Sequence, residues 1–340
     1  MIMSASLSPR ANLSAMNTLG LTAYASRILP LQSIEQLESW RLDPELNTLP
    51  WLILGGGSNL VLSESLDRVV LHVELKGKRL LREDDEAWYV AAAAGELWHP
   101  FVQWTLAQGW GGLENLSLIP GTVGAAPVQN IGAYGVELKD TLDHLTAIDL
   151  SSGQMQQFSA ADCQFAYRDS FFKQSTTPWL ICEVVFRLPK NHQTKTNYGD
   201  IANALQAMQL PATPSTVSQA ICQVRQAKLP DPAVIGNAGS YFKNPIVSAA
   251  HYQKLQARYP QMVAYALADG QYKLAAGWLI EQAGWKGRRL GPVGMYEKQA
   301  LVLVNHGGAT AADVLALELA VQADVAALFE LVLESEPVKC

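Results

Sequence analysis

Two glycine-rich segments could bind a nucleotide through their backbone. The segment Gly55-Gly56-Gly57-Ser58-Asn59 follows a short apolar run. Its consecutive N–H groups, with no Cβ in the way, suit a pyrophosphate. A tight turn between two strands is the alternative, since glycine-rich turns are common. Leu60 stands where the dinucleotide fingerprint has its third glycine, so the sequence does not support a Rossmann fold.

A second segment, residues 118–135, is long, uncharged and built mainly of small residues. Such a segment lets the backbone approach a large flat ligand, while Thr122, Gln129 and Asn130 offer neutral hydrogen bonds. A buried connector is the alternative, but a long irregular loop inside a compact domain is usually functional. One loop suited to phosphates and one suited to a ring system together predict a dinucleotide ligand.

Other common chemistries find little support. The sequence has no Gly-Lys-Ser/Thr and no HExxH motif. Its histidines are dispersed, and we interpret them as structural or surface residues: His72, His99, His144, His192, His251 and His306. Its cysteines form no CxxC pair, and we expect them to be buried or idle thiols rather than metal ligands: Cys163, Cys182, Cys222 and Cys340. We therefore predict no metal site.

Composition bounds the class of protein. Of the 340 residues, 49% are hydrophobic and 16% charged, which favours two or three globular domains over a disordered chain. The net charge of −6 gives no global attraction to nucleic acid or to an acidic membrane. The N-terminal segment lacks the pattern of a signal peptide, and residues 115–136 contain too much glycine and proline for a spanning helix. We expect a soluble, intracellular protein.

Periodicity predicts an α+β chain with its strands early and its helices mostly late. Ser33 is a plausible cap for the first helix, and the double proline at 230 and 232 is the best domain boundary. The predicted helices are 33–41, 97–108, 215–228, 249–259, 273–283 and 311–331. The predicted strands are 51–54, 60–62, 69–73, 88–94, 145–150, 154–158, 180–188 and 301–305.

Four further motifs accompany the two glycine-rich loops: Tyr167-Arg168-Asp169-Ser170, Tyr198-Gly199-Asp200, Gly239-Ser240-Tyr241-Phe242-Lys243-Asn244-Pro245 and Leu333-Glu334-Ser335-Glu336. Together they resemble the UDP-N-acetylenolpyruvoylglucosamine reductase (MurB) family of bacterial peptidoglycan synthesis. The resemblance starts near Asn17-Thr18-Leu19-Gly20 and runs in order to the C-terminus. The Tyr198 motif resembles the subtype whose tyrosine loop covers the substrate.

The resemblance implies a PCMH-type (vanillyl-alcohol-oxidase-like) fold that holds FAD without a covalent bond. Two subdomains, 1–74 (joined by 330–340) and 75–229, would bind FAD, and an α+β domain, 230–329, would bind substrate. The implied reaction passes a hydride from NADPH through FAD to UDP-N-acetylglucosamine enolpyruvate, giving UDP-N-acetylmuramate. We expect a cytoplasmic monomer.

The resemblance also assigns three catalytic residues. Ser240 would donate the proton, although a loop serine beside glycine more often bonds its own backbone. Arg168 would hold the substrate carboxylate as charge develops; an ion pair with Asp169 or Glu183 is its alternative. Glu336 would polarise the site or relay a proton. The family usually continues with Arg and Gly after this glutamate, whereas this chain has Pro337-Val338-Lys339-Cys340, so Glu334 remains an alternative and Glu336 is preferred on spacing.

The remaining site residues divide between cofactor and substrate. The predicted FAD-binding residues are Leu54, Gly55, Gly56, Gly57, Ser58, Asn59, Leu60, Pro120, Gly121, Thr122, Gly124, Ala125, Gln129, Asn130, Gly132, Ala133, Tyr134 and Gly135. The predicted substrate-binding residues are Tyr167, Tyr198, Lys228, Asn244, Tyr265, Lys273 and Gln299. Two rivals stay open: an FAD-dependent sugar or alcohol oxidase of the same fold, and a nucleotide-sugar-binding protein without catalysis.

Overall fold

The computed structural model describes residues 10–340, which form two compact units. Unit 1 extends up to Ala11 and continues over Ala25–Gly56 and Asp67–Ala227, and unit 2 comprises Asn12–Tyr24, Gly57–Leu66 and Lys228–Cys340. The prediction that the N-terminal segment is not a signal peptide concerns residues 1–9 among others, and these lie outside the described residues. The division of the chain into three domains stays a prediction.

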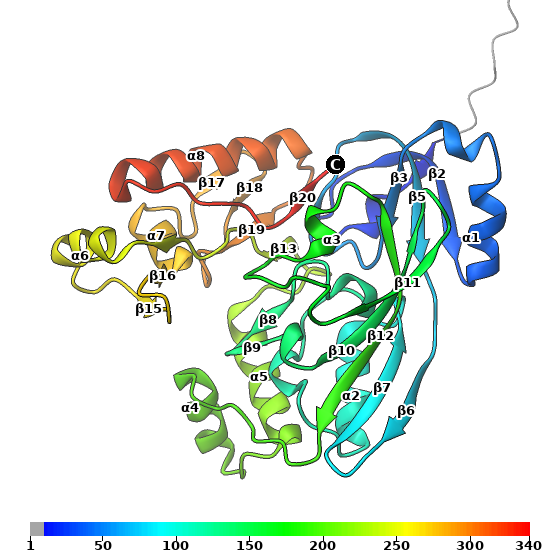
Figure 1. The fold of residues 1–340 in the computed structure, drawn as a ribbon. Coiled ribbons are helices and arrows are strands. Elements are labelled where there is room, and N and C mark those ends of the chain that lie inside the picture. The colour runs from blue at the N-terminus through cyan, green and yellow to red at the C-terminus, as the bar shows by residue number, and fades with distance from the viewer. Residues whose placement is uncertain (1–9) are drawn as a thin grey trace, which may run out of the picture. The chain divides into compact units, whose positions relative to one another are not determined.

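The first sheet of unit 1 has the strand order β1-β2-β5-β3. Its strands are β1 (Ala11–Asn12), β2 (Tyr24–Leu31), β3 (Trp51–Leu54) and β5 (Ser65–Val73), with β3 parallel to β5. Helix α1 (Ile34–Arg41) lies beside β2, β3 and β5 (Figure 1). The helix begins at Ser33, which forms a reciprocal capping box with Gln36 and so satisfies exposed N–H groups of the first turn.

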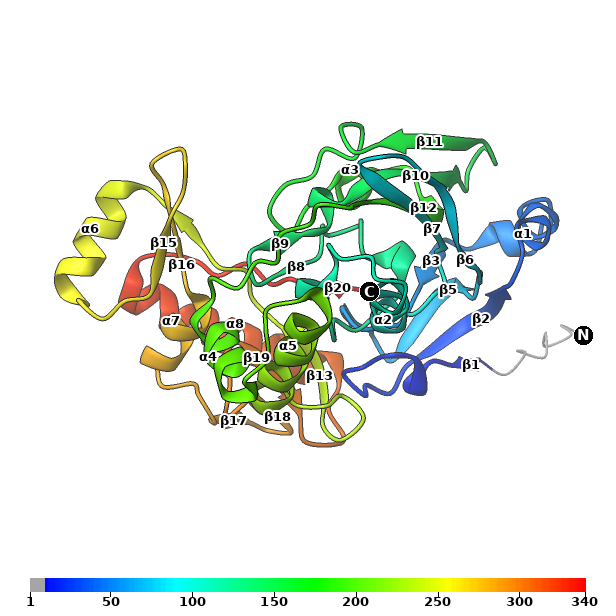
Figure 2. The same ribbon diagram turned by 90° about the horizontal axis from the view of Figure 1, so that it is seen from below.

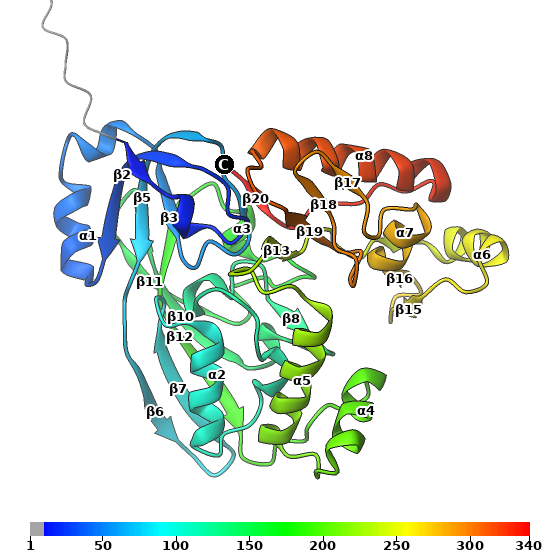
Figure 3. The same cartoon turned by 180° about the vertical axis from the view of Figure 1, so that it is seen from behind.

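A five-stranded antiparallel sheet forms the rest of the unit 1 core, in the order β11-β10-β12-β7-β6. Its strands are β6 (Lys78–Glu83), β7 (Ala87–Ala93), β10 (Leu142–Asp149), β11 (Met155–Ser159) and β12 (Trp179–Pro189). Helix α2 (Trp98–Ala107) lies across one face of this sheet (Figure 3). Trp98 and Phe101 pack there against Phe186 with ring centroids 5.9 and 5.2 Å apart, which excludes water from that face.

Unit 1 also contains two helices near its C-terminal end and three short elements. Helices α4 (Gly199–Met208) and α5 (Pro214–Lys228) lie side by side in Figures 2 and 3, and they bury Ile201, Val217 and Ile221 between them. The short elements are β8 (Gly132–Ala133), β9 (Val136–Glu137) and α3 (Phe171–Gln174).

Unit 2 has one long helix on an antiparallel sheet. Helix α8 (Ala311–Phe329) begins at Thr310, which forms a capping box with Asp313, and it buries Val314, Leu317 and Val321 in the core of unit 2. The sheet has the order β13-β19-β18-β17, and a smaller sheet has the order β14-β16-β15. Their strands are β13 (Gly236–Ser240), β14 (Ile246–Val247), β15 (Ala264–Ala266), β16 (Tyr272–Leu274), β17 (Arg289–Leu290), β18 (Val293–Met295) and β19 (Val302–Asn305). The remaining elements are α6 (Ala249–Arg258), α7 (Ala276–Gln282), β4 (Leu60–Val61) and β20 (Val338–Lys339).

Most predicted elements are confirmed to within a few residues, one differs, and several elements, among them β2, β6 and α4, were not predicted. The helix predicted from Lys273 starts only at Ala276, because Tyr272–Leu274 pairs with strands on both sides. The polar stretch before the double proline, for which no helix was predicted, contains α4. Within residues 10–340, no helix is both long and apolar enough to span a bilayer.

Candidate active site

The two predicted cofactor loops touch through their glycines. A Cβ on Gly56 would lie 2.9 Å from the Cα of Gly121, and a Cβ on Gly55 would lie 2.6 Å from the Thr122 hydroxyl oxygen. Real Cβ atoms almost never approach another heavy atom so closely, so only glycine allows this packing. Within unit 1, the sequence therefore brings the start of the first loop against the second loop.

The second loop is fixed to the sheet and carries backbone strain. The Val123 N–H donates to the Glu96 carbonyl and the Gly124 N–H to the Ala94 carbonyl, each at 2.9 Å. Several of its non-glycine residues, and Arg168 beside it, hold positive φ: Leu118 (60°), Asn130 (45°), Tyr134 (50°) and Arg168 (56°). Such conformations cost about 1 to 3 kcal/mol each and cluster at binding sites.

Asn130 uses its side chain inside the protein. Its amide donates to the Glu137 carboxylate (3.0 Å) and the Ala166 carbonyl (3.1 Å), and its Oδ1 accepts from the Lys139 N–H (3.1 Å). This predicted cofactor-binding residue therefore holds the loop in shape, and its contribution to a bound cofactor would come through its backbone.

Arg168 is attached to the same loop. Its Nη2 donates to the Gly132 carbonyl at 2.7 Å, and its guanidinium carbon lies 5.2 Å from the centre of the Tyr167 ring. Glu183, one alternative partner considered from sequence, instead accepts two hydrogen bonds from Arg79 at 2.6 and 3.1 Å. The predicted carboxylate-binding pair Tyr167 and Arg168 is thus brought against the predicted cofactor loop.

Tyr198 lies against the end of the second loop. Its ring meets the Tyr134 ring edge-on, with centroids 5.9 Å apart, and a Cβ on Gly135 would lie 3.0 Å from a Tyr198 ring carbon. Gly135 has φ of 78°, so it is required both for its backbone conformation and for the space it leaves. The structure thereby joins a predicted substrate-binding residue to the predicted cofactor loop.

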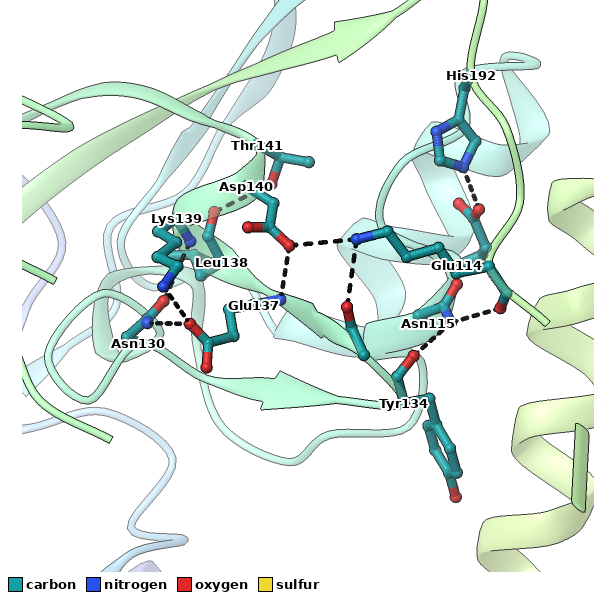
Figure 4. A network of polar contacts seen from close by, with 12 residues as sticks. Glu114, Asn115, Asn130, Tyr134, Glu137, Leu138, Lys139, Asp140, Thr141 and His192 are labelled. Carbon is teal, nitrogen blue, oxygen red and sulfur yellow. Dashed lines mark hydrogen bonds and ion pairs between the residues drawn. The ribbon is translucent and has the colours of Figure 1, made fainter. Parts of the chain in front are cut away.

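Four residues, which we call the Tyr198 anchor, hold the connector before Tyr198: Glu114, Asn115, His192 and Lys195 (Figure 4). The Asn115 amide donates to the carbonyls of Tyr134 (3.0 Å) and Lys195 (2.9 Å). The Lys195 ammonium donates to the Gly135 carbonyl at 3.2 Å. One buried amide therefore fixes the cofactor loop and the connector together.

The carboxylate of Glu114 is fully buried beside His192, and it also accepts a hydrogen bond from the Gly112 N–H at 2.6 Å. Burial alone would raise the pKa of Glu114, but the hydrogen bonds from His192 and Gly112, with the charge of His192, outweigh it and leave that pKa below its ordinary value. The anchor is thus built around an ionised carboxylate.

In unit 2, Ser240 ends strand β13, opposite Val302 of β19. The next residue, Tyr241, is fully buried and donates its hydroxyl to the Glu318 carboxylate of α8 at 2.8 Å. The Lys339 ammonium bonds the same carboxylate at 2.7 Å. A buried charge on α8 therefore fixes the backbone beside the predicted proton donor.

The two candidate C-terminal glutamates have different environments. Glu336 is buried, its N–H donates to the Tyr241 carbonyl at 2.8 Å, and its carbonyl accepts from the Asn59 amide at 3.3 Å. Glu334 is exposed and forms an ion pair with Lys243. Glu336 is thus the glutamate held next to Ser240 and beside the end of the first loop.

Two of the remaining predicted substrate residues of unit 2, Asn244 and Gln299, lie beside the start of α7. The Asn244 Oδ1 accepts from the Ala276 N–H at 2.9 Å, and the Gln299 side-chain oxygen lies 3.0 Å from where a Gly277 Cβ would be. Lys273, directly before this helix, stands opposite Tyr265 in the β15–β16 pair. Lys228 begins the last segment of unit 2.

Comparisons with known proteins decide the family. Residues 231–340 match the model for the C-terminal domain of UDP-N-acetylenolpyruvoylglucosamine reductase, and residues 29–159 match an FAD binding domain. The reductase of that name from Bdellovibrio bacteriovorus is 54% identical over 329 residues, which cover 96% of this chain and 98% of that protein. The one from Azoarcus sp. is 55% identical over 333 residues, covering 96% of each. This chain belongs to the UDP-N-acetylenolpyruvoylglucosamine reductase family.

A solved structure extends the comparison to the fold. The crystal structure of MurB from Thermus caldophilus matches with a TM-score of 0.68 at 24% identity, covering 97% of this chain and 98% of that one. The predicted family and its FAD-binding α+β fold are confirmed, as is the class of FAD-containing oxidoreductase.

The residues present fit FAD. The contact of Gly56 with Gly121 forms a cradle that any side chain would fill. Residues 115–136, which include the second loop, carry no charge that would repel a dinucleotide. When bound, FAD supplies hydride transfer, so the protein has to supply binding, orientation and the proton.

Sequence patterns did not reveal the residues that position this MurB-family site. Asn115, Glu114 and Glu318 were not singled out, because their partners are remote in sequence: Lys195 lies 80 positions from Asn115, and Tyr241 lies 77 from Glu318. The available signal was the position of Glu114 and Asn115 beside the uncharged loop, where a buried charge or amide needs a partner.

Proposed function

We propose that this protein reduces UDP-N-acetylglucosamine enolpyruvate to UDP-N-acetylmuramate with NADPH, by way of bound FAD, as a cytoplasmic monomer in peptidoglycan precursor synthesis. Relatives of more than 50% identity over almost the whole chain carry the reductase name, and this is the observation on which the proposal rests. The loop packing that leaves room only for glycine supports it independently.

Three side chains are assigned roles in this reaction. Arg168, held by the Gly132 carbonyl, binds the enolpyruvyl carboxylate through its planar fork while negative charge develops there. Ser240 donates a proton from its Oγ to the carbon next to the carboxylate. Glu336, buried beside the Tyr241 backbone, polarises this region and returns a proton to the serine.

Substrate binding is assigned to both units, each through its own residues. In unit 1, Tyr167 and Tyr198 line the cofactor loop. In unit 2, Asn244 and Gln299 lie beside the start of α7, Lys273 pairs with Tyr265 between strands β16 and β15, and Lys228 precedes the double proline. Lysine suits the diphosphate of the nucleotide as a flexible point charge.

The deciding experiment records the visible spectrum of the purified protein under anaerobic conditions. We expect a flavin band that bleaches on addition of NADPH and returns on addition of the enolpyruvyl nucleotide. A band that returns only with oxygen would instead establish an oxidase. A protein that binds the nucleotide but never reoxidises with it would be a binding protein, and a protein that takes up no FAD would overturn the proposal.

A further inference from the structure

Arg225 of helix α5 is a half-buried cation that the assignments above do not use. Its Nε is inaccessible to solvent and has no hydrogen-bond partner within residues 10–340. Burying a guanidinium is costly unless an anion or several acceptors satisfy it. The Nε of Arg225 therefore lacks the acceptor that a guanidinium N–H away from water requires.

The groups around Arg225 are neutral. It hydrogen-bonds the Tyr134 side chain, and the other group that acts on it electrostatically is Cys222. Burial raises the pKa of both Tyr134 and Cys222, so neither carries negative charge at neutral pH. Burial, followed by the charge of Arg225, lowers the pKa of His99, so this imidazole does not supply an anion either.

These neighbours place Arg225 beside both ends of the second loop. Tyr134 lies at the end of that loop, and His99 accepts a hydrogen bond from the N–H of Leu118, at its start, at 3.0 Å. Residues 115–136 contain no Lys or Arg, so a negatively charged ligand bound there meets no cation from the loop itself. Helix α5 supplies one at a fixed position.

We propose that the guanidinium of Arg225 forms a fork-type contact with a phosphate of a nucleotide bound at the second loop. This inference rests on the proposed function, in which FAD, NADPH and the UDP-sugar all carry phosphates. The enolpyruvyl carboxylate is already assigned to Arg168. Guanidinium matches phosphate oxygens in a bidentate geometry, and its weak hydration makes arginine the cation suited to a buried site.

The test compares ligands that differ only by phosphate. Dissociation constants are measured by fluorescence or calorimetry for apoprotein with FAD and riboflavin. They are measured for holoprotein with UDP and uridine, and with 2′,5′-ADP and adenosine. The variants are Arg225→Met, Arg225→Lys and, as a control, Arg258→Met, which removes an exposed arginine from helix α6.

We expect Arg225→Met to weaken one phosphate-bearing ligand by about 10- to 100-fold and to leave its phosphate-free counterpart and the control variant unchanged. The ligand whose affinity falls identifies whether Arg225 binds a phosphate of FAD, of the UDP-sugar or of NADPH. Arg225→Lys keeps the charge and the apolar stem but loses the fork, so we expect it to weaken the same ligand by several-fold.

Two results would overturn the inference. The first is that Arg225→Lys binds all three phosphate-bearing ligands as tightly as the wild type does. This result would exclude a fork-type contact even if Arg225→Met fails to fold. The second is that Arg225→Met loses as much affinity for the phosphate-free ligands as for the phosphate-bearing ones. The proposed function is tested separately. It fails if the enolpyruvyl nucleotide does not reoxidise the reduced flavin of the wild-type protein.

Discussion

Glu114 and His192, 78 positions apart in the sequence, are joined by a hydrogen bond between carboxylate and imidazole at the base of the connector that leads to Tyr198. The carboxylate accepts from the backbone of Gly112 as well, so the pair is tied both to the segment after α2 and to the segment before α4. This contact makes the position of a predicted substrate residue depend on a charge that does not touch the substrate.

The pH dependence of stability follows from this carboxylate. Because the folded-state pKa of Glu114 lies below its ordinary value of 4.5, its stabilising contribution is present above that pH and is lost as the pH falls through the folded pKa. We expect Glu114→Gln to be less stable at pH 7 by about 1 to 3 kcal/mol, because one amide oxygen cannot replace both carboxylate acceptors. Its stability should also change less than that of the wild type between pH 5 and about 3. Urea unfolding across this range measures both quantities, and Glu86→Gln, at an exposed pair, serves as the control.

Asn115→Leu tests the Tyr198 anchor. The substitution removes both donors and leaves the Tyr134 and Lys195 carbonyls without the amide that joins them. We expect the KM for the enolpyruvyl nucleotide to rise about tenfold, a loss of about 1.4 kcal/mol in binding, while the rate of flavin reduction by NADPH changes little. Asn191→Leu, at an exposed site on the same connector, should leave both parameters unchanged. Equal losses in the two half-reactions would contradict a positioning role.

Gly56→Ala tests the contact between the two loops. A methyl group 2.9 Å from the Gly121 Cα has to push one backbone away from the other, so we expect the affinity of the apoprotein for FAD to fall by about tenfold or more. Gly109→Ala is the matched control, since its φ is 81° but no atom lies within 4 Å of its added carbon. It should cost about 1 kcal/mol of stability and leave FAD affinity intact. Similar losses of FAD affinity in both variants would argue against a cradle.

Ser240→Ala tests the proton donor. Removing the hydroxyl should leave reduction of the flavin by NADPH near the wild-type rate and slow reoxidation by the enolpyruvyl nucleotide by about 100-fold or more. Anaerobic stopped-flow absorbance separates the two half-reactions. A variant in which both slow equally would show that Ser240 acts on folding or cofactor binding instead.

Arg168→Lys tests the need for a planar fork. The lysine ammonium can reach either the Gly132 carbonyl or a substrate carboxylate, but it cannot bond both in the same geometry. We expect the rate of reoxidation by the nucleotide to fall by about tenfold or more, with the flavin spectrum unchanged. Near-normal turnover would refute a carboxylate-binding role.

Local signals were sufficient for much of the fold. Ser33 caps a helix as predicted, and the strands predicted over 145–150 and 154–158 form β10 and β11, where Ile148 pairs with Met155. Local signals failed where tertiary pairing decides the structure. Tyr272–Leu274 has helical spacing next to α7, yet strands β14 and β15 hold it as a strand, because cross-strand hydrogen bonds outweigh weak helical propensity.

The candidate site shows the same division. Gly56 and Gly135 could be singled out from the sequence because close packing and positive φ demand glycine. The joining of Asn115 to Lys195 could not, since no local pattern specifies a hydrogen bond between segments 80 positions apart.

Strand β20 runs parallel to β4, and the backbone of Ser63 bonds to a carbonyl 277 positions later in the chain. At about 5 to 20 residues per second, the ribosome takes roughly 15 to 55 s to make the intervening chain. For that interval the apolar stretch around Val61 and Leu62, which the folded protein buries, has no partner strand. Synthesis of this protein therefore includes a period in which chaperones can bind a segment that later becomes inaccessible.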